Sequence, residues 1–520
     1  LEQSRITSPF DYHEWGATAS GPIIRNKTFW FAGFQQHLEK LAETITTTVP
    51  SPEMLAGNFN FGGRGLPIYD PDTLRRDATG AYIRDAFPNN VIPTSRFDPA
   101  AAKVLALKPW LAQSRPGDIT ANGPLNNLEG DFGGLYKFER YDAKIDHQFS
   151  NVHKIFGRYS RVRHRSEERP VRGLTNPLQF GNVYVRPLDF HNIVVSDSYT
   201  FSPSTINEMR AGFNRRAFSA VPPTFGENWA QQLGIPNASP ETFPDLLNSG
   251  GGRFYGFGPG GASYTRAEDF TFSENLTKVL GKHTFKVGYE FIRTRYNSSI
   301  ESLPSGAYRF GGTDFPFRAN TGNAFASFLL GTVTRADFTR TTATWLPRWS
   351  SHAAYAQDTW RPVRNLTLEL GLRWAFESPY TTKYGQQSQF DPTVKDPLTG
   401  LPGAILHQPG KLAKNDLNNF EPRLGLAWTF RPKFVFRSSF GVTHSDLFTN
   451  GLNQNFEEYQ ATASLQAPVG DPNYVFKLSQ GPPAVRFNIA SDGSVPYVGT
   501  NYSGRNASWY DPNMRLPYVM

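Results

Sequence analysis

Strict two-residue alternation between residues 366 and 377 is the feature that most limits what this chain can fold into. Every second residue is apolar, and the residues between are small, polar or charged. The apolar set is Leu366, Leu368, Leu370, Leu372, Trp374 and Phe376. Period two places such a set on one face of a β-strand, whereas a helix would scatter it around its circumference. The segment therefore predicts a strand with one apolar and one polar face.

The length of this strand points to a membrane. It runs for about eleven residues, whereas strands of soluble sheets usually stop at about five or six. A tilted strand needs about 9–11 residues to cross a bilayer. Residues 353–360 predict a preceding strand, and residues 361–365 predict a tight turn, because Pro362 cannot donate to a ladder. Together the two strands predict an amphipathic hairpin.

Five further hairpins are predicted on the same grounds, which gives about twelve strands. Their turns fall at Arg25–Lys27, Asn151, Ser202–Ser204, Gly281–Lys282 and Arg431–Lys433. The links within hairpins are short, and we expect the links between hairpins to span some tens of residues in every case. Short periplasmic turns alternating with long outer loops are typical of up-and-down transmembrane barrels. The predicted fold class is thus all-β, an antiparallel up-and-down transmembrane β-barrel with long extracellular loops.

The longest predicted loop covers residues 37–134 and is rich in Pro, Gly, Asn and Asp. A short helix is expected within it near residues 98–107, with Asp98 as the N-cap and Pro99 at the first helical position. Residues 70–77 lack the Gly and the final Glu of a calcium-binding loop and predict a Pro-containing turn. Connections of this length usually signal function or disorder.

The two strand faces supply the candidate site residues. In a barrel the apolar face touches lipid and the polar face lines the lumen. The candidate lipid-facing residues are Leu366, Leu368, Leu370, Leu372, Trp374, Phe376, Leu424, Leu426 and Trp428. The candidate lumen-facing residues are Glu369, Arg373, Glu377, Arg423, Arg437, Lys286 and Glu290. Such charged groups either bind a solute or pair with one another across strands of a wet barrel.

Composition narrows the function classes. Cys is absent, which excludes disulfide scaffolds, thiolate zinc sites and cysteine nucleophiles. The ten histidines are dispersed and no catalytic motif has the required spacing, so we expect no metal, no cofactor and no enzyme. The net charge of +8 forms no block of like charges, which argues against a nucleic-acid partner. No apolar run approaches the roughly 18 residues of a membrane-spanning helix.

A soluble β-sandwich is the alternative to the barrel. Alternating strands also build sandwiches, in which the apolar face packs on a second sheet and the polar face meets water. Strand length and the alternation of short and long links favour the barrel, since a sandwich has no reason to place its short links at one end.

Several motifs resemble one family of membrane proteins. Residues 355–360 and 365–374 are similar to the barrel signature of TonB-dependent outer-membrane transporters, and most resemble the Oar-like branch, whose members usually carry an N-terminal carboxypeptidase-regulatory-like domain. Further segments with the same resemblance are Gly21–Phe31, Ile68–Pro71, Asn90–Pro93, Arg96–Ala100, Arg140–Asp146, Phe201–Arg210, Gly281–Gly288 and Glu421–Trp428. The resemblance covers nearly the whole chain.

The resemblance implies a plugged barrel of roughly twenty-two strands in the outer membrane of a Gram-negative-type bacterium. Such a barrel imports a scarce or bulky solute by proton-motive force through TonB. Residues 1–520 would form part of that barrel, with the plug, the regulatory-like domain and the TonB-contacting parts absent from this chain. The expected partners are outer-membrane lipid, the TonB complex and an unknown solute. An adhesion or structural surface protein and a passive porin are the alternative functions.

Overall fold

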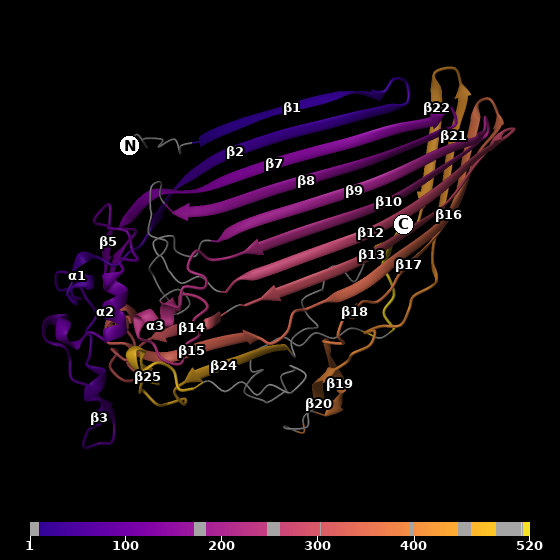
Figure 1. Ribbon diagram of the computed structural model, residues 1–520. Coiled ribbons are helices and arrows are strands. Elements are labelled where there is room, and N and C mark those ends of the chain that lie inside the picture. The colour runs from indigo at the N-terminus through magenta and orange to yellow at the C-terminus, as the bar shows by residue number, and fades with distance from the viewer. Residues whose placement is uncertain are drawn as a thin grey trace.

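Antiparallel strands dominate the structure, a computed structural model that describes residues 10–170, 184–246, 261–301, 303–395, 400, 402–445, 459–484, 511 and 513–520. The largest sheet joins twelve long strands in chain order, and a short strand, β18, pairs beside β16 (Figure 1). Its strands are β1 Phe10–Ile24, β2 Thr28–Thr47, β7 Leu128–Ser150, β8 His153–Pro170, β9 Val185–Ser202, β10 Thr205–Ala220, β12 Ser263–Leu280, β13 His283–Ile300, β16 Pro347–Val363, β17 Leu366–Glu377, β18 Thr381–Thr382, β21 Asn419–Arg431 and β22 Phe434–Gly441.

All six predicted hairpins are present in this sheet, so the predicted fold class is confirmed. They are β1–β2, β7–β8, β9–β10, β12–β13, β16–β17 and β21–β22. Each turn lies where Gly, Pro, Asn, Lys or Ser interrupts the alternation. Asn26 and Lys433, for example, adopt positive φ at two of these turns.

The strands run further than the alternation indicates. β2 has 20 residues and β7 has 23, and they pair continuously from Thr28↔His147 to Thr47↔Leu128. The first long connection is therefore residues 48–127, shorter than the predicted 37–134. The expectation of tens of residues in every inter-hairpin link is also wrong for the second link, residues 171–184, because β8 and β9 extend to Pro170 and from Val185. Strands of this length continue beyond the roughly 30 Å of hydrocarbon.

The apolar face of the main sheet is uncovered, which excludes the sandwich alternative. A sandwich would bury this face beneath a second sheet. Instead, Leu372 and Leu424 are each 50% exposed and Phe436 is 51% exposed. The register sets Leu370 opposite Leu424, so the apolar face continues from strand to strand.

The long connections fold into a second unit at one end of the sheet, here called the loop lobe. Its helices are α1 Pro52–Leu55, α2 Pro99–Ala106, α3 Trp229–Leu233 and α4 Ala324–Leu329, with 3-10 helices η1 Pro71–Thr73, η2 Pro88–Asn90, η3 Thr94–Arg96 and η6 Leu478–Gln480. Its five-stranded sheet contains β11 Asp245–Leu246, β14 Leu303–Phe310, β15 Thr332–Thr341, β24 Gln460–Gln466 and β25 Phe476–Lys477.

Four two-stranded ladders complete the described secondary structure. They pair β3 Arg75–Arg76 with β4 Tyr82–Ile83, β5 Asp118–Thr120 with β6 Gly123–Leu125, β19 Ser388–Lys395 with β20 Pro402–His407, and β23 Thr443–His444 with β26 Tyr518–Val519. No helix in the described part of the chain is long and apolar enough to cross a membrane.

The loop lobe has its own hydrophobic core, which the sequence did not reveal. The core gathers side chains from four connections that are far apart in the chain, among them Met54, Phe243, Phe328, Phe338 and Leu478. Helix α2 is anchored in this core and begins as predicted: the Asp98 carboxylate accepts hydrogen bonds from the backbone N–H groups of Ala100 (2.8 Å) and Ala101 (3.4 Å).

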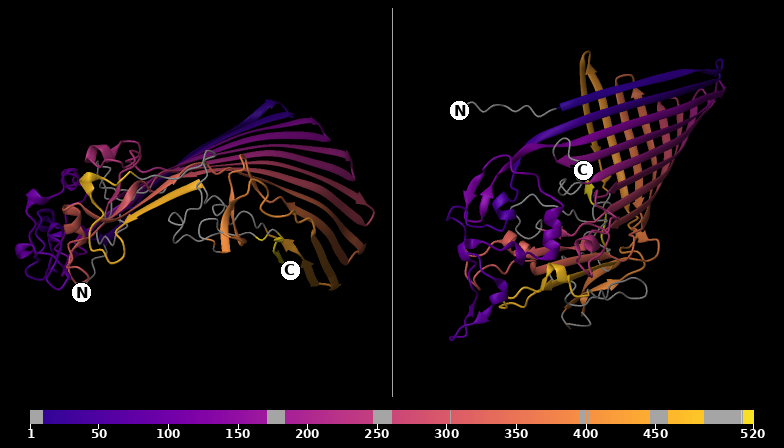
Figure 2. Two further views of the ribbon diagram at one scale, coloured as in Figure 1. Left: turned by 90° about the horizontal axis from the view of Figure 1, so that it is seen from below. Right: turned by 60° about the vertical axis from the view of Figure 1, so that its left-hand side comes forward.

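The main sheet separates the loop lobe from the hairpin turns. Figure 1 shows the lobe at one end of the long strands and the turns at the opposite end. Figure 2 shows that the sheet is curved, with the C-terminal end of the chain on its inner side. Within the described residues the twelve strands do not close into a ring, since β1 and β22 each have one neighbour in the sheet.

Candidate functional site

The register places all seven predicted lumen-facing residues on one face of the main sheet, called here the polar face. Arg373 lies opposite Tyr355 on β16 and Glu421 on β21, and Glu369 lies opposite Thr359 and Gly425. The remaining five, Glu377, Arg423, Arg437, Lys286 and Glu290, share this face by the same pairing. The nine candidate lipid-facing residues lie on the opposite face.

Four of the charged side chains on the polar face form a carboxylate–arginine cluster across β13, β17 and β21. Its centre is Glu421, whose side chain is fully buried. Arg373 Nη1 lies 2.9 Å from Glu421 Oε2, and Arg373 Nη2 lies 3.6 Å from Glu290 Oε2. Arg423 Nη2 lies 3.8 Å from Glu421 Oε2. A buried carboxylate is stable only when paired and hydrogen-bonded, and these arginines meet that requirement.

The C-terminal end of the described chain covers this cluster. The backbone N–H of His444, in β23, donates to Glu421 Oε1 at 2.9 Å, and β23 pairs with β26. A cavity of ≈ 140 Å³ lies beside the cluster and is lined by Glu290, Arg373, Glu377, His444 and Leu516, among others. It has room for a small polar group, not for a whole bulky solute.

Sequence reasoning found only part of the cluster. Glu290, Arg373 and Arg423 were predicted on the polar face, and the structure brings them together. Lys286, Glu369 and Arg437 lie on that face without an ion pair among the described residues. Glu421 was not predicted as a site residue, although it lies two residues before Arg423 and hence on the same side of the strand. Only the register between β17 and β21 identifies it as the partner of Arg373.

Removing the Arg373 charge should destabilise the main sheet. We expect Arg373→Met to lower the free energy of unfolding by about 1.5–3 kcal/mol, because it leaves the buried Glu421 carboxylate without its closest cation. Arg437→Met, on the same face but without an ion pair, should stay within about 0.5 kcal/mol. Urea unfolding in detergent measures both. Equal values for the two variants would show that the Arg373–Glu421 pair contributes nothing to stability.

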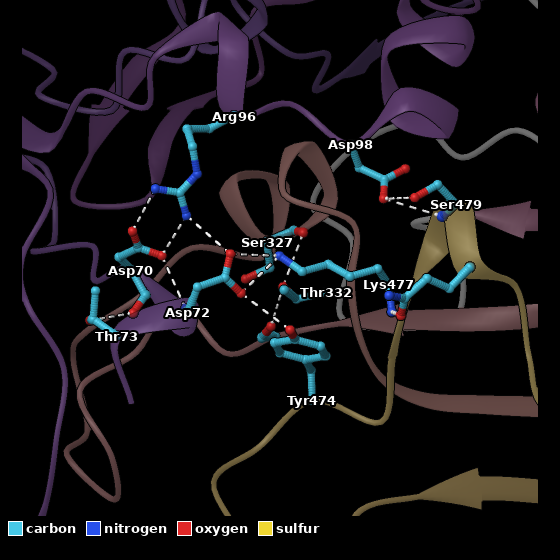
Figure 3. A network of polar contacts seen from close by, with 12 residues as sticks. Asp70, Asp72, Thr73, Arg96, Asp98, Ser327, Thr332, Tyr474, Lys477 and Ser479 are labelled. Atoms are coloured by element: carbon cyan, nitrogen blue, oxygen red, sulfur yellow. Dashed lines mark hydrogen bonds and ion pairs between the residues drawn. The ribbon is translucent and has the colours of Figure 1, made fainter. Parts of the chain in front are cut away.

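A second polar network ties the first long connection to residues 474–479 within the loop lobe (Figure 3). The Arg96 guanidinium donates two hydrogen bonds of 2.8 Å to the Asp70 carboxylate and one of 3.1 Å to the Asp72 carboxylate. Asp72 also accepts hydrogen bonds from Lys477 Nζ at 3.1 Å and from the Tyr474 hydroxyl at 3.2 Å. Asp72 is thus the link between the two segments.

Asp98 makes a second link between the same segments, as Figure 3 shows. Besides capping α2, its carboxylate accepts hydrogen bonds from the Ser479 hydroxyl at 2.7 Å and from the Ser479 backbone N–H at 3.2 Å. Gly331 lies against Asp98 with φ +69, and a Cβ there would come within 2.4 Å of the carboxyl carbon. A third connection thereby packs onto this junction.

Buried Arg84 makes a third link. Its side chain is 1% exposed, and its Nη1 donates to the backbone carbonyl of Asp314 at 2.7 Å and contacts the Asp314 carboxylate at 3.3 Å. Its Nη2 donates to the carbonyl of Pro472. Burial lowers the pKa of the guanidinium, which nevertheless stays charged because the value of a free Arg is so high. The loop lobe is therefore one folded unit built by several connections.

Acid should loosen the junction at Asp72. Burial raises the pKa of its carboxyl, but the hydrogen bonds and charges of Lys477, Tyr474 and Arg96 outweigh that effect and hold the pKa below the ordinary 3.8. A lowered pKa means that the stabilisation is complete above 3.8 and is lost as pH falls through the folded-state value. We expect faster hydrogen exchange in residues 474–480, relative to intrinsic rates, as pH falls from about 5 to about 3.

Two substitutions test the assignment of that pH dependence. Asp72→Asn should raise exchange of residues 474–480 already at the higher pH and flatten the pH profile. Asp77→Asn is the control, because that carboxylate bonds only within its own turn, to Thr79 and Ala81. A pH profile that Asp72→Asn leaves unchanged would contradict the role given to Asp72.

No group of three or more His, Cys, Asp or Glu side chains in the described ranges is placed to hold a metal ion. The polar face and the loop lobe offer hydrogen-bonding and ionic groups.

Comparison with solved structures finds an outer membrane transporter and a siderophore receptor, both of low sequence identity. The outer membrane transporter YddB of Escherichia coli matches at 9% identity with a TM-score of 0.46, covering 87% of this chain and 41% of its own. The siderophore receptor PiuA of Acinetobacter baumannii matches at 10% identity with a TM-score of 0.35, and the match covers 86% of this chain and 50% of the receptor chain. This chain thus spans about half the length of these proteins or less. No curated protein matches the chain in sequence.

The family comparison covers almost the whole sequence. The family described as "Outer membrane beta barrel domain" matches residues 2–520. This agrees with the sheet of amphipathic hairpins, its uncovered apolar face and its division into short turns and long loops. The chain belongs to the outer membrane beta-barrel domain family and is located in the outer membrane.

Proposed function

We propose that this chain forms part of the wall of an outer-membrane receptor that takes up a scarce or bulky solute by TonB-dependent transport. The observation that carries the proposal is a charged polar face that ends beneath a folded loop lobe. A wall of this kind gives a polar solute a path through the membrane, and the lobe stands where the solute would arrive.

The two faces of the main sheet have different roles in this proposal. Leucines and aromatic residues such as Leu372, Leu424 and Trp428 contact lipid, since hydrocarbon accepts apolar side chains at no cost. The carboxylate–arginine cluster, centred on the buried Glu421, faces the lumen. Its internal ion pairs hold β13, β17 and β21 in register, while Lys286, Glu369 and Arg437 stay available to a passing solute.

Capture of the solute is assigned to the loop lobe. Loops joined by a shared core and by the links at Asp72, Asp98 and Arg84 present a preformed surface, which loses less entropy on binding than separate flexible loops would. The lobe therefore suits a receptor better than a simple pore, which needs no such folded cap.

The TonB-dependent step rests on the sequence resemblance to the Oar-like branch. In that reading the plug and the segment that contacts TonB belong to other parts of the protein. The barrel would then be completed by strands that pair with the edges of β1 and β22, because an unpaired backbone group in hydrocarbon costs several kcal/mol.

Uptake by cells tests the proposed function. Cells that produce the intact protein are given a fluorescent peptide, a fluorescent oligosaccharide and a ferric chelate as separate probes. We expect at least one probe to accumulate and its accumulation to stop when a protonophore collapses the proton-motive force. Flux that persists with the protonophore would instead identify a passive pore. Loss of cell attachment on deleting the lobe, with no uptake of any probe, would identify an adhesion platform.

The lipid-facing assignment has its own test. Leu372→Arg should cost about 2–4 kcal/mol of folding free energy in a bilayer, because the cation would face hydrocarbon near the middle of β17. Leu372 suits the test better than Leu370, which lies opposite Asp358 and could pair an introduced Arg with that carboxylate. Thr367→Arg, on the polar face of the same strand, is the control and should cost much less. Equal costs would contradict the face assignment, and a larger cost for Thr367→Arg would show that the faces are the wrong way round.

A further inference from the structure

The hairpin turns gather positive charge at the end of the sheet opposite the loop lobe. Seven cations lie in these turns or at the adjoining strand ends, and this set is called here the turn rim. Its members are Arg25, Lys27, Lys282, Arg361, Arg364, Arg431 and Lys433. Residues 25–27, 151–152, 203–204, 281–282, 361–365 and 431–433 contain no Asp or Glu. The rim is therefore a surface of one sign.

The rim cations are exposed and unpaired. All seven side chains belong to exposed residues, and none takes part in an ion pair with a carboxylate among the described residues. Lys282 Nζ donates to the backbone carbonyl of Pro362, which leaves its charge uncompensated. In the loop lobe, by contrast, Arg75 and Arg96 are paired with Asp85 and Asp70 at 2.7 and 2.8 Å. The cations of the rim therefore lack the carboxylate partners that these two arginines of the loop lobe have.

Rings on the apolar face mark the depth at which the rim lies. Next to the turns these rings contact one another across strands. The ring centroids of Phe149 and His153 are 4.8 Å apart, and those of His153 and Tyr199 are 5.2 Å apart. Trp428 and Phe430 make a similar contact at 5.7 Å. Aromatic side chains next to strand ends sit at the level of lipid headgroups. The rim cations, a few residues further along the strands, then lie at or just beyond the phosphate groups.

We propose that the turn rim binds the phosphate groups of anionic phospholipids in the leaflet that faces the periplasm. Short turns of outer-membrane barrels are on the periplasmic side, where the adjoining leaflet presents phospholipid headgroups. Lys and Arg near an anionic lipid surface are attracted to it, and the attraction falls off within a Debye length of about 10 Å. The inference depends on the membrane orientation of the sheet and is independent of the proposed transport function.

Selective lipid binding by the intact protein tests the inference. The protein is reconstituted into phosphatidylcholine vesicles containing phosphatidylglycerol, with bromine on the acyl chains of one lipid or the other. Quenching of the tryptophans, which include Trp30, Trp360 and Trp428 near the turns, then reports which lipid surrounds the barrel. We expect phosphatidylglycerol to be enriched about fivefold over phosphatidylcholine at low salt, and the enrichment to vanish at about 0.5 M NaCl.

Three variants separate the rim from general charge effects. Changing all seven rim residues to Gln should bring the enrichment to about one. Changing seven exposed cations on the loop side to Gln should leave it unaltered; these are Arg64, Lys103, Arg309, Arg318, Arg340, Lys383 and Lys395. Replacing Arg25, Arg361, Arg364 and Arg431 by Lys keeps the charge and should keep the enrichment. Heat-modifiable mobility on gels checks that each variant is folded.

Several results would overturn the proposal. Enrichment that persists in a folded Gln variant of the rim would overturn it, and so would an equal loss of enrichment in the loop-side variant. If the Gln variant of the rim fails to fold, salt-independent enrichment in the original protein decides against the proposal. Displacement of the lipid by inorganic phosphate alone would point to a site for free anions. Binding of soluble polyglutamate without any lipid preference would point to an acidic protein partner instead.

Discussion

Backbone hydrogen bonding between neighbouring strands is the constraint on which the rest of the structure depends. In hydrocarbon no water is present to hydrogen-bond a backbone N–H or C=O group, so each strand must form these hydrogen bonds with the neighbouring strands. The register that satisfies the ladder also decides which side chains share a face. The continuous apolar face, the carboxylate–arginine cluster and the turn rim all follow from that one set of pairings.

The loop lobe obeys a different rule, since it has water around it and must build a core of its own. Its buried phenylalanines come from connections that are far apart in the chain. Asp72, Asp98 and Arg84 then fix how these connections meet. Because each of these three groups also has a partner in another connection, the connections support one another in the folded lobe.

What the sequence could predict is what lies close along the chain. Alternation from Leu366 to Phe376 identified a strand and its faces, and Asp98 before Pro99 identified the start of α2. The Arg373–Glu421 pair could not be predicted, because it depends on the register between strands separated by a long connection. The turn rim escaped for a related reason: a search for blocks of like charge along the chain misses cations that only the sheet brings side by side. The core of the lobe was hidden because its members are scattered over four connections.

The junction between Asp98 and Ser479 has a consequence for how the protein matures. These residues are 381 positions apart, so the lobe has a high contact order, and contacts of that kind form late because a long loop must be closed first. Leu478 belongs to the same core as Phe325 and Phe328 of helix α4, so the segment that carries it completes that core. Until residues 474–480 are in place the core of the loop lobe is incomplete, and transiently exposed apolar surface of this kind favours aggregation during folding.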